Sequence, residues 1–224
     1  MRRIVVGVAV GFLLAYSSFT QQTVSADEVS SQLQSFAWKM TFEREGLPVP
    51  EWTIARGMDG KTTFHARRAD GVAVPETSFV MSVGTSTRLS SLLVASKGMT
   101  PCESRAKNLA NMGRKTMEFS LALTSAALAT CSFNYSENKP LLVIADLGQA
   151  IAYTQQAGTE LARLHRFDRL GLDREMILLD TAVAEGNAIE LQSIAETLHS
   201  IATDPLVLER VRSKALSLLE RATR

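Results

Sequence analysis

The chain has 224 residues, with 24 Lys or Arg against 23 Asp or Glu, so its formal net charge is only +1. This balance argues against non-specific nucleic-acid binding and against attraction to an anionic membrane, since both need a basic excess or a clustered basic face, and the sequence has neither. Hydrophobic residues make up 46% of the chain, which is enough for a packed core.

The N-terminal 26 residues have the three-part organisation of a secretory signal peptide. Arg2 and Arg3 precede an apolar run, Ile4–Tyr16, and Val24-Ser25-Ala26 supplies the small residues that a signal peptidase recognises. The apolar run is shorter than the roughly 20 residues that a membrane-spanning helix needs. We therefore predict cleavage before Asp27, a periplasmic or secreted protein, and no integral membrane segment after cleavage.

Cys102 and Cys131 are the only cysteines in the chain. An even number of cysteines in an exported protein favours a disulfide, and the absence of a Cys-x-x-Cys pair argues against catalytic thiol exchange. Two buried free thiols are the alternative. We predict a Cys102–Cys131 disulfide.

The first half of the exported chain reads as a sheet. Alternation of apolar and polar residues predicts strands over 36–42, 52–56, 61–68 and 78–83, with a hairpin turn at Gly57-Met58-Asp59-Gly60, and two further strands around 117–121 and 130–135. Helices are predicted from Thr85 or Ser86 to about Ser96 and over about 103–111. The aromatic residues of these strands are assigned to a core between the sheet and its covering helices.

The second half reads as helices. Asn138 and Pro140 are typical of a helix start, and apolar spacing continues to about Phe167; further helices are predicted from Asp173 to near Gly186, over 188–203, and from Asp204-Pro205 to about Arg221. The last two resemble one HEAT or armadillo-type helix pair, although no second copy recurs at a fixed period. The predicted divisions are a signal peptide (1–26), a mixed part (27–137) and a helical part (138–224) on the same core.

The expected fold class is therefore α+β: an antiparallel sheet of about six strands covered on one face by helices, with a C-terminal antiparallel helical part. Taken whole, with Cys-Ser-Phe-Asn-Tyr-Ser-Glu-Asn at 131–138 and His-Arg-Phe-Asp-Arg-Leu-Gly-Leu-Asp at 165–173, the chain resembles secreted bacterial proteins of an uncharacterised kind. This resemblance names no family.

Ser104 and Lys107 have the Ser-x-x-Lys spacing of the penicillin-recognising serine enzymes. Ser136-Glu137-Asn138 and Lys115-Thr116-Met117 resemble the other two motifs of that family. Their order along the chain is reversed, however, and Met117 replaces the glycine. Four-residue patterns of common amino acids also arise by chance, so we do not assign this activity.

His165, Asp168 and Asp173 are the candidates for a polar site, because 165–173 is the densest polar stretch in the chain. A histidine beside a carboxylate is a possible general base, but the same residues also suit ion pairs and caps at a helix corner. No residue completes a metal-ligand set at helical spacing, so neither a metal nor another cofactor is expected. The catalytic residues, if any, are not identified.

The sequence favours a non-catalytic exported protein that binds an unidentified protein or an envelope ligand. The alternative is a periplasmic or secreted hydrolase whose catalytic groups meet only in the fold, with His165 as base. A serine or second carboxylate near the imidazole, inside a cleft, would favour the hydrolase.

Overall fold

A computed structural model describes residues 35–104, 112–121 and 129–223. The strands are β1 (Phe36–Glu43), β2 (Glu51–Arg56), β3 (Lys61–Arg67), β4 (Ala73–Val80), β5 (Arg114–Leu121) and β6 (Ala129–Phe133). They form one antiparallel sheet in the order β4-β3-β2-β1-β5-β6. The predicted α+β class is confirmed. The signal peptide, the cleavage site at Asp27 and most of the helix predicted over 103–111 lie outside the described residues.

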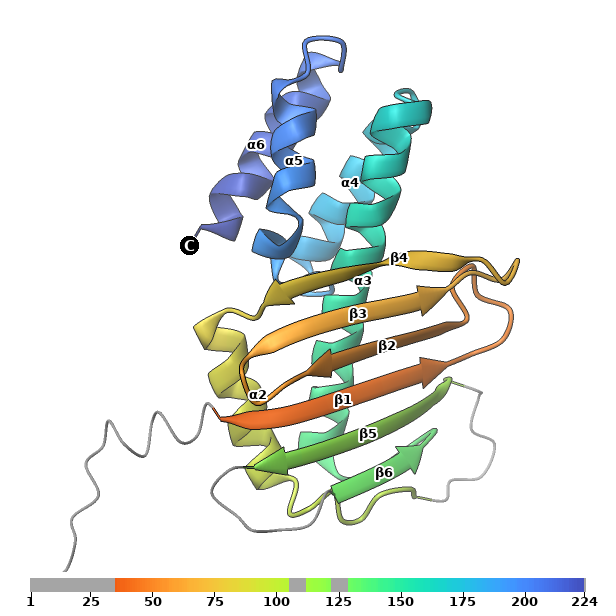
Figure 1. The fold of residues 1–224 in the computed structure, drawn as a ribbon, viewed down its shortest axis with the longest axis vertical. Helices are drawn as coiled ribbons and strands as arrows, with labels where there is room; N and C mark the ends of the chain where they lie inside the picture. Colours follow the sequence, from red (N-terminus) through yellow and green to blue (C-terminus); the bar gives the residue numbers. More distant parts are fainter. Residues whose placement is uncertain (1–34, 105–111, 122–128, 224) are drawn as a thin grey trace, which may run out of the picture.

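Helices α2 (Val83–Ala95) and α3 (Lys139–Phe167) cover one face of the sheet (Figure 1). The strands alternate buried and exposed residues, so the aromatic side chains of β1, β2, β3, β5 and β6 fill the space beneath these helices. Phe79 and Tyr135, also assigned to the core, are only half-buried. The opposite face is polar, and Thr41 and Thr53 hydrogen-bond across neighbouring strands at 3.0 Å.

Helix α3 continues past the sheet and becomes part of a second, helical layer. There it packs with α4 (Gly171–Ala184), the short 3-10 helix η1 (Leu191–Ile194), α5 (Ala195–Thr203) and α6 (Glu209–Ala222). Figure 1 shows this helical part beyond the β4 edge of the sheet. None of the helices in the described residues is both long and apolar enough to cross a bilayer.

Two close approaches along α3 explain how one helix serves both layers. A Cβ on Gly148 would lie 2.4 Å from Met40 Sδ of β1, and a Cβ on Gly158 would lie 2.3 Å from Ile194 Cγ2 of η1. The missing side chains let α3 pack directly against the sheet at one point and against η1 at the other.

Several predicted boundaries are wrong. β4 runs from Ala73 to Val80 and not over 78–83. It can include Pro75 because β4 is an edge strand, where a residue without a backbone N–H is tolerated. Ser82, not Thr85 or Ser86, caps α2: its hydroxyl accepts a hydrogen bond from Thr85 N at 3.2 Å. Glu103 and Ser104 are not helical, and β6 ends at Phe133.

The helical boundaries also differ from the prediction. Helix α4 begins at Gly171, and the segment predicted as one helix over 188–203 is divided into η1 and α5. Asp204-Pro205 does not open a helix. Asp204 Oδ1 instead accepts a hydrogen bond from Leu206 N at 2.9 Å, which forms a turn, and α6 begins only at Glu209.

Candidate functional site

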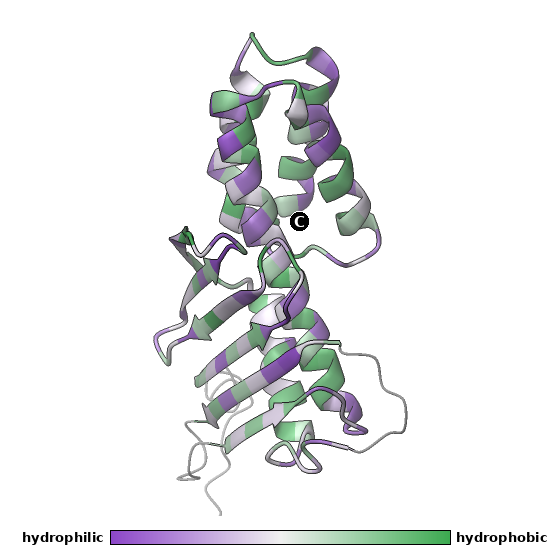
Figure 2. Ribbon diagram, turned by 90° about the vertical axis from the view of Figure 1, so that its right-hand side faces the viewer, coloured by the Kyte–Doolittle hydropathy of each residue, from purple (hydrophilic) through white to green (hydrophobic). Residues whose placement is uncertain are grey.

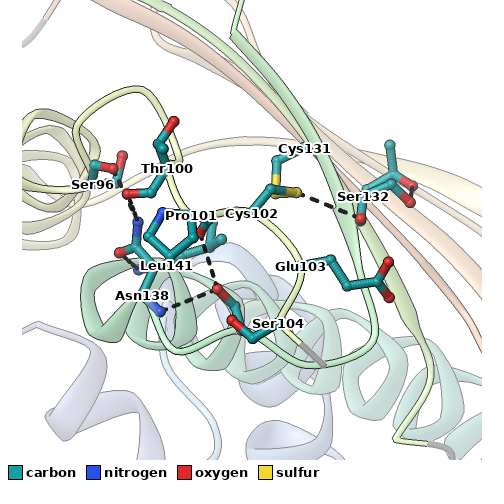
Figure 3. The surroundings of a disulfide bond; sticks show 12 residues. Ser96, Thr100, Pro101, Cys102, Glu103, Ser104, Cys131, Ser132, Asn138 and Leu141 are labelled. Atoms are coloured by element: carbon teal, nitrogen blue, oxygen red, sulfur yellow. Dashed lines mark hydrogen bonds between the residues drawn. A yellow bond between two sulfur atoms is a disulfide. The ribbon is translucent and has the colours of Figure 1, made fainter. Parts of the chain in front are cut away.

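The disulfide ties the α2–β5 connection to the sheet. Cys131 lies on the core face of β6, and Cys102 follows Pro101; their Cα atoms are 5.7 Å apart and their sulfur atoms 2.06 Å apart (Figure 3). The predicted bridge is confirmed. A buried structural disulfide is compatible with an oxidising extracytoplasmic compartment.

Asn138 holds the same connection from the helix side. Its side-chain oxygen accepts a hydrogen bond from Leu141 N at 3.3 Å and so caps α3. Its amide nitrogen donates to the carbonyl oxygens of Ser96 and Thr100, both at 3.1 Å (Figure 3). The disulfide and Asn138 together fix the segment that leaves α2, which indicates a structural role for this region.

His165 contacts a carboxylate, but one that the sequence did not suggest. His165 Nε2 lies 2.8 Å from Asp204 Oδ2, in the turn between α5 and α6, and Ser200 Oγ of α5 lies 3.4 Å from His165 Nδ1. With Nε2 protonated, the ring donates to Asp204 and accepts from Ser200. This is the order of groups required for a serine activated by a histidine base.

The other two candidate residues, Asp168 and Asp173, contact other groups and not His165. Asp168 Oδ1 accepts a hydrogen bond from Gly171 N at 3.2 Å at the start of α4. Asp173 forms a two-point ion pair with Arg210, at 2.9 and 2.8 Å, which joins α4 to α6. The hydrogen bonds from Arg210 lower the pKa of Asp173 below its usual value. Both residues have the capping and pairing roles that suit a helix corner.

Asp204 is the meeting point of the two helix turns. Besides His165 it faces Arg169, whose Nη2 lies 3.6 Å from Asp204 Oδ2. The hydrogen bond from the Leu206 backbone, followed by that from His165, lowers the pKa of Asp204. Sequence reasoning missed this residue because the Asp-Pro pair was interpreted as a helix start.

A shallow hollow of about 250 Å³ lies between α3 and α5 beside these groups, lined by Ala162, His165, Glu196, Thr197 and Ser200. It is open to solvent. Ser200 lies inside α5, where backbone N–H groups are already engaged in the helix. The hollow therefore offers a nucleophile and a base but no oxyanion donors from that backbone. A second open hollow, of about 460 Å³, is formed by the loops at 45–50 and Ala69.

A different feature stands at the far end of the helical part. Phe167, the last residue of α3, is 71% exposed, and Leu170, in the turn between α3 and α4, is 86% exposed. Leu206, in the turn between α5 and α6, is 70% exposed. The His165–Asp204 and Arg210–Asp173 pairs hold these two turns side by side. We call Phe167, Leu170 and Leu206 the distal tip. Figure 1 shows both turns at the end of the long axis, and the hydrophobic loop there is green in Figure 2.

The chain matches no protein-family model, and no curated protein matches it in sequence. No cluster of three His, Cys, Asp or Glu side chains that could hold a metal ion occurs within 35–104, 112–121 and 129–223. His65 contacts Glu76 at 3.7 Å on the exposed side of the sheet. Of the Ser-x-x-Lys pattern only Ser104 is described; Lys107 lies outside the described residues.

Proposed function

We propose that this chain is an exported, non-catalytic protein that binds a partner or an envelope component through the distal tip. The observation that carries the proposal is the exposure of Phe167, Leu170 and Leu206 on two adjacent turns. Single exposed apolar residues are common, but a group of large ones at one end of a molecule marks an interaction site. The N-terminal leader pattern and the disulfide support export.

The ion pairs behind the tip support the same proposal. The ion pairs of Asp204 and Asp173 connect the turn at 168–170 with the turn at 204–208. The exposed apolar side chains therefore lie on turns whose positions are fixed by ion pairs. A preorganised surface loses less conformational entropy on binding. In this proposal the role of His165 is to connect α3 with the turn at 204–208 through Asp204.

The proposal is tested by replacing all three tip residues with serine, Phe167→Ser, Leu170→Ser and Leu206→Ser, in the exported protein. Because these side chains are exposed, the melting temperature is expected to stay near that of the wild type. Retention of the protein in the cell-envelope fraction is expected to fall. A matched control is the double variant Val80→Ser and Val83→Ser, which removes two equally exposed apolar residues at the β4–α2 junction. Retention that the tip variant leaves unchanged would refute the proposal.

A second candidate function is a hydrolase, and it is favoured by one observation. The imidazole of His165 lies between Asp204 Oδ2, at 2.8 Å, and Ser200 Oγ, at 3.4 Å, which is the order of groups of a histidine base and a serine nucleophile, with the serine at a long distance. The hollow beside them is the place where a substrate would bind. Labelling with a fluorophosphonate, which reacts with activated serines, is the test: labelling abolished by Ser200→Ala and by His165→Gln would support the hydrolase. Labelling equal in the wild type and Ser200→Ala would exclude it.

A further inference from the structure

A buried polar layer separates the two hydrophobic clusters along α3, the helix that continues from the sheet into the helical part (Figure 1). On this helix the buried residues of the first cluster end at Ala152, and those of the second begin at Ala157. Between them lie Thr154 and Gln155, whose side chains are buried. At this level of α3 the sheet and the helical part therefore meet through polar groups and not through one continuous apolar core.

Gln155 belongs to a chain of hydrogen bonds that leads from the sheet to the helical part. Its Oε1 accepts a hydrogen bond from Thr77 Oγ1 of β4 at 2.8 Å, and its Nε2 donates to Ser193 Oγ of η1 at 2.5 Å. Ser193 Oγ in turn donates to the carbonyl oxygen of Glu190 at 2.6 Å. These bonds connect the edge strand, α3 and η1 across the polar layer.

The carboxylate of Glu190 connects the same layer to the start of α2. Its Oε2 accepts a hydrogen bond from Ser82 N and its Oε1 one from Ser82 Oγ, both at 2.7 Å, and Gln192 Nε2 also donates to Oε2. The residue is 6% exposed, and none of the ion pairs between described residues includes it. Hydrogen bonds from neutral donors therefore offset the burial of this carboxylate. Its φ of 63° is also unfavourable for a residue with a side chain.

Helix α3 has features that favour bending at the polar layer. Thr154 Oγ1 lies 3.2 Å from Ala150 O, and Thr159 Oγ1 donates to Gln155 O at 3.0 Å. A hydroxyl that bonds to the carbonyl four residues earlier competes with the backbone hydrogen bond and bends a helix. Gly158 lies in the same stretch and lowers its helical stability further.

We infer that the helical part rotates as a unit relative to the sheet, by bending of α3 at 154–159, and that the contact between Glu190 and Ser82 holds the closed arrangement. Polar interfaces between parts of one chain permit relative motion, whereas large hydrophobic ones prevent it. Opening exchanges the hydrogen bonds of Glu190 with Ser82 for bonds to water and leaves the buried residues of both clusters packed. Ile189, which packs against the first cluster, is an apolar contact that opening removes. This inference does not depend on what the distal tip binds.

The test is the distribution of distances between two spin labels, measured by double electron–electron resonance. Because both native cysteines form the disulfide, two introduced cysteines are labelled selectively. Lys39→Cys, on the outer face of the sheet, and Ser213→Cys, on α6, replace exposed residues. With Glu190 present we expect one narrow distance. Glu190→Ala should broaden the distribution and add a second, shifted distance.

Glu185→Ala is the matched control, because it removes an exposed carboxylate from the same connection after α4, one that bonds only to Asn187 among the described residues. It should leave the distance narrow. Thr77→Val removes the β4 end of the hydrogen-bond chain and should also broaden the distribution; it decides the test if circular dichroism shows that Glu190→Ala does not fold. An unchanged narrow distance in each of these two variants that folds, or equal broadening in the control, would overturn the inference.

Discussion

At the residue scale, the Cys102–Cys131 bridge closes a loop of 29 residues. In the chain-entropy description, a loop of this length stabilises the folded state by about 3.5 kcal/mol, before any strain. Cys102→Ser is therefore expected to lower the free energy of unfolding by about 2 to 4 kcal/mol under oxidising conditions. Urea denaturation measures this, and the same comparison in the presence of a reductant is the control. An equal loss in both conditions would mean that packing, not the bridge, is responsible.

Asn138 is the second residue whose contribution can be separated into parts. Asn138→Ala removes the cap of α3 and the two hydrogen bonds to Ser96 O and Thr100 O, and should cost about 2 to 4 kcal/mol. Asn138→Ser keeps an oxygen that can cap α3 but removes the amide that donates to both carbonyl oxygens. It should lie between the wild type and the alanine variant in thermal denaturation. A serine variant as stable as the wild type would show that the two donated bonds contribute nothing.

The two residues also show what local sequence can and cannot reveal. The capping role of Asn138 and the pairing of the cysteines follow from residue type, neighbours and number, and both were predicted. The bonds from Asn138 to Ser96 and Thr100 connect positions about 40 residues apart and have no local signal. The same holds for the contact between His165 and Asp204.

At the scale of elements, three carboxylates join the helices of the C-terminal part. Asp173 pairs with Arg210 and Asp180 with Lys214, both between α4 and α6, and Asp204 joins the end of α5 to α3. The hydrogen bonds from Arg210 and Lys214, and for Asp204 that from the Leu206 backbone, lower the pKa of each carboxyl below its usual value. These pairs connect α4 with α6 and the end of α5 with α3, at the edge of the buried cluster that packs the helical part.

Because these pKa values are lowered in the folded state, the stability that they contribute is present above the unfolded pKa and is lost as the pH falls through the folded values. The protein should therefore become less stable to urea between about pH 5 and pH 2, followed by circular dichroism at 222 nm. Asp180→Asn removes one of the titrating groups, so its stability should fall less steeply over this range. An identical slope in the variant would contradict the assignment of the acid sensitivity to these pairs.

The strands with a regular alternation of buried and exposed residues are the ones that the sequence predicted well. Alternation of apolar residues located β1, β2, β3 and β5 because each has one buried and one solvent-facing side. It failed at β4, an edge strand whose pattern is weak and which contains Pro75. At 204–208 the Asp-Pro pair was interpreted as a helix start, although Asp204 caps a turn there.

At the scale of the whole molecule, helix α3 joins two hydrophobic clusters. Its first half packs on the sheet with residues such as Ile144 and Ile151, and its second half packs in the helical part with Leu161 and Leu164. A helix shared by two clusters should make them unfold together, because neither keeps its buried surface when α3 is lost.

The two tryptophans allow this to be measured. Trp38 and Trp52 lie in β1 and β2, so their fluorescence reports on the sheet, whereas circular dichroism at 222 nm reports mainly on the helices. The urea transitions followed by the two signals are expected to coincide. Transitions with clearly different midpoints would show that the sheet and the helical part unfold as separate units.

If the distal tip is the binding surface of this protein, a photo-reactive group placed there will crosslink to whatever it binds in the producing cells. Site-specific photo-crosslinking measures this, with the substitution Leu170→p-benzoylphenylalanine at the tip and Lys39→p-benzoylphenylalanine, on the outer face of the sheet, as the exposed control. After irradiation we expect crosslinked products from position 170 and none from position 39. No product from position 170, or the same products from both positions, would contradict the claim.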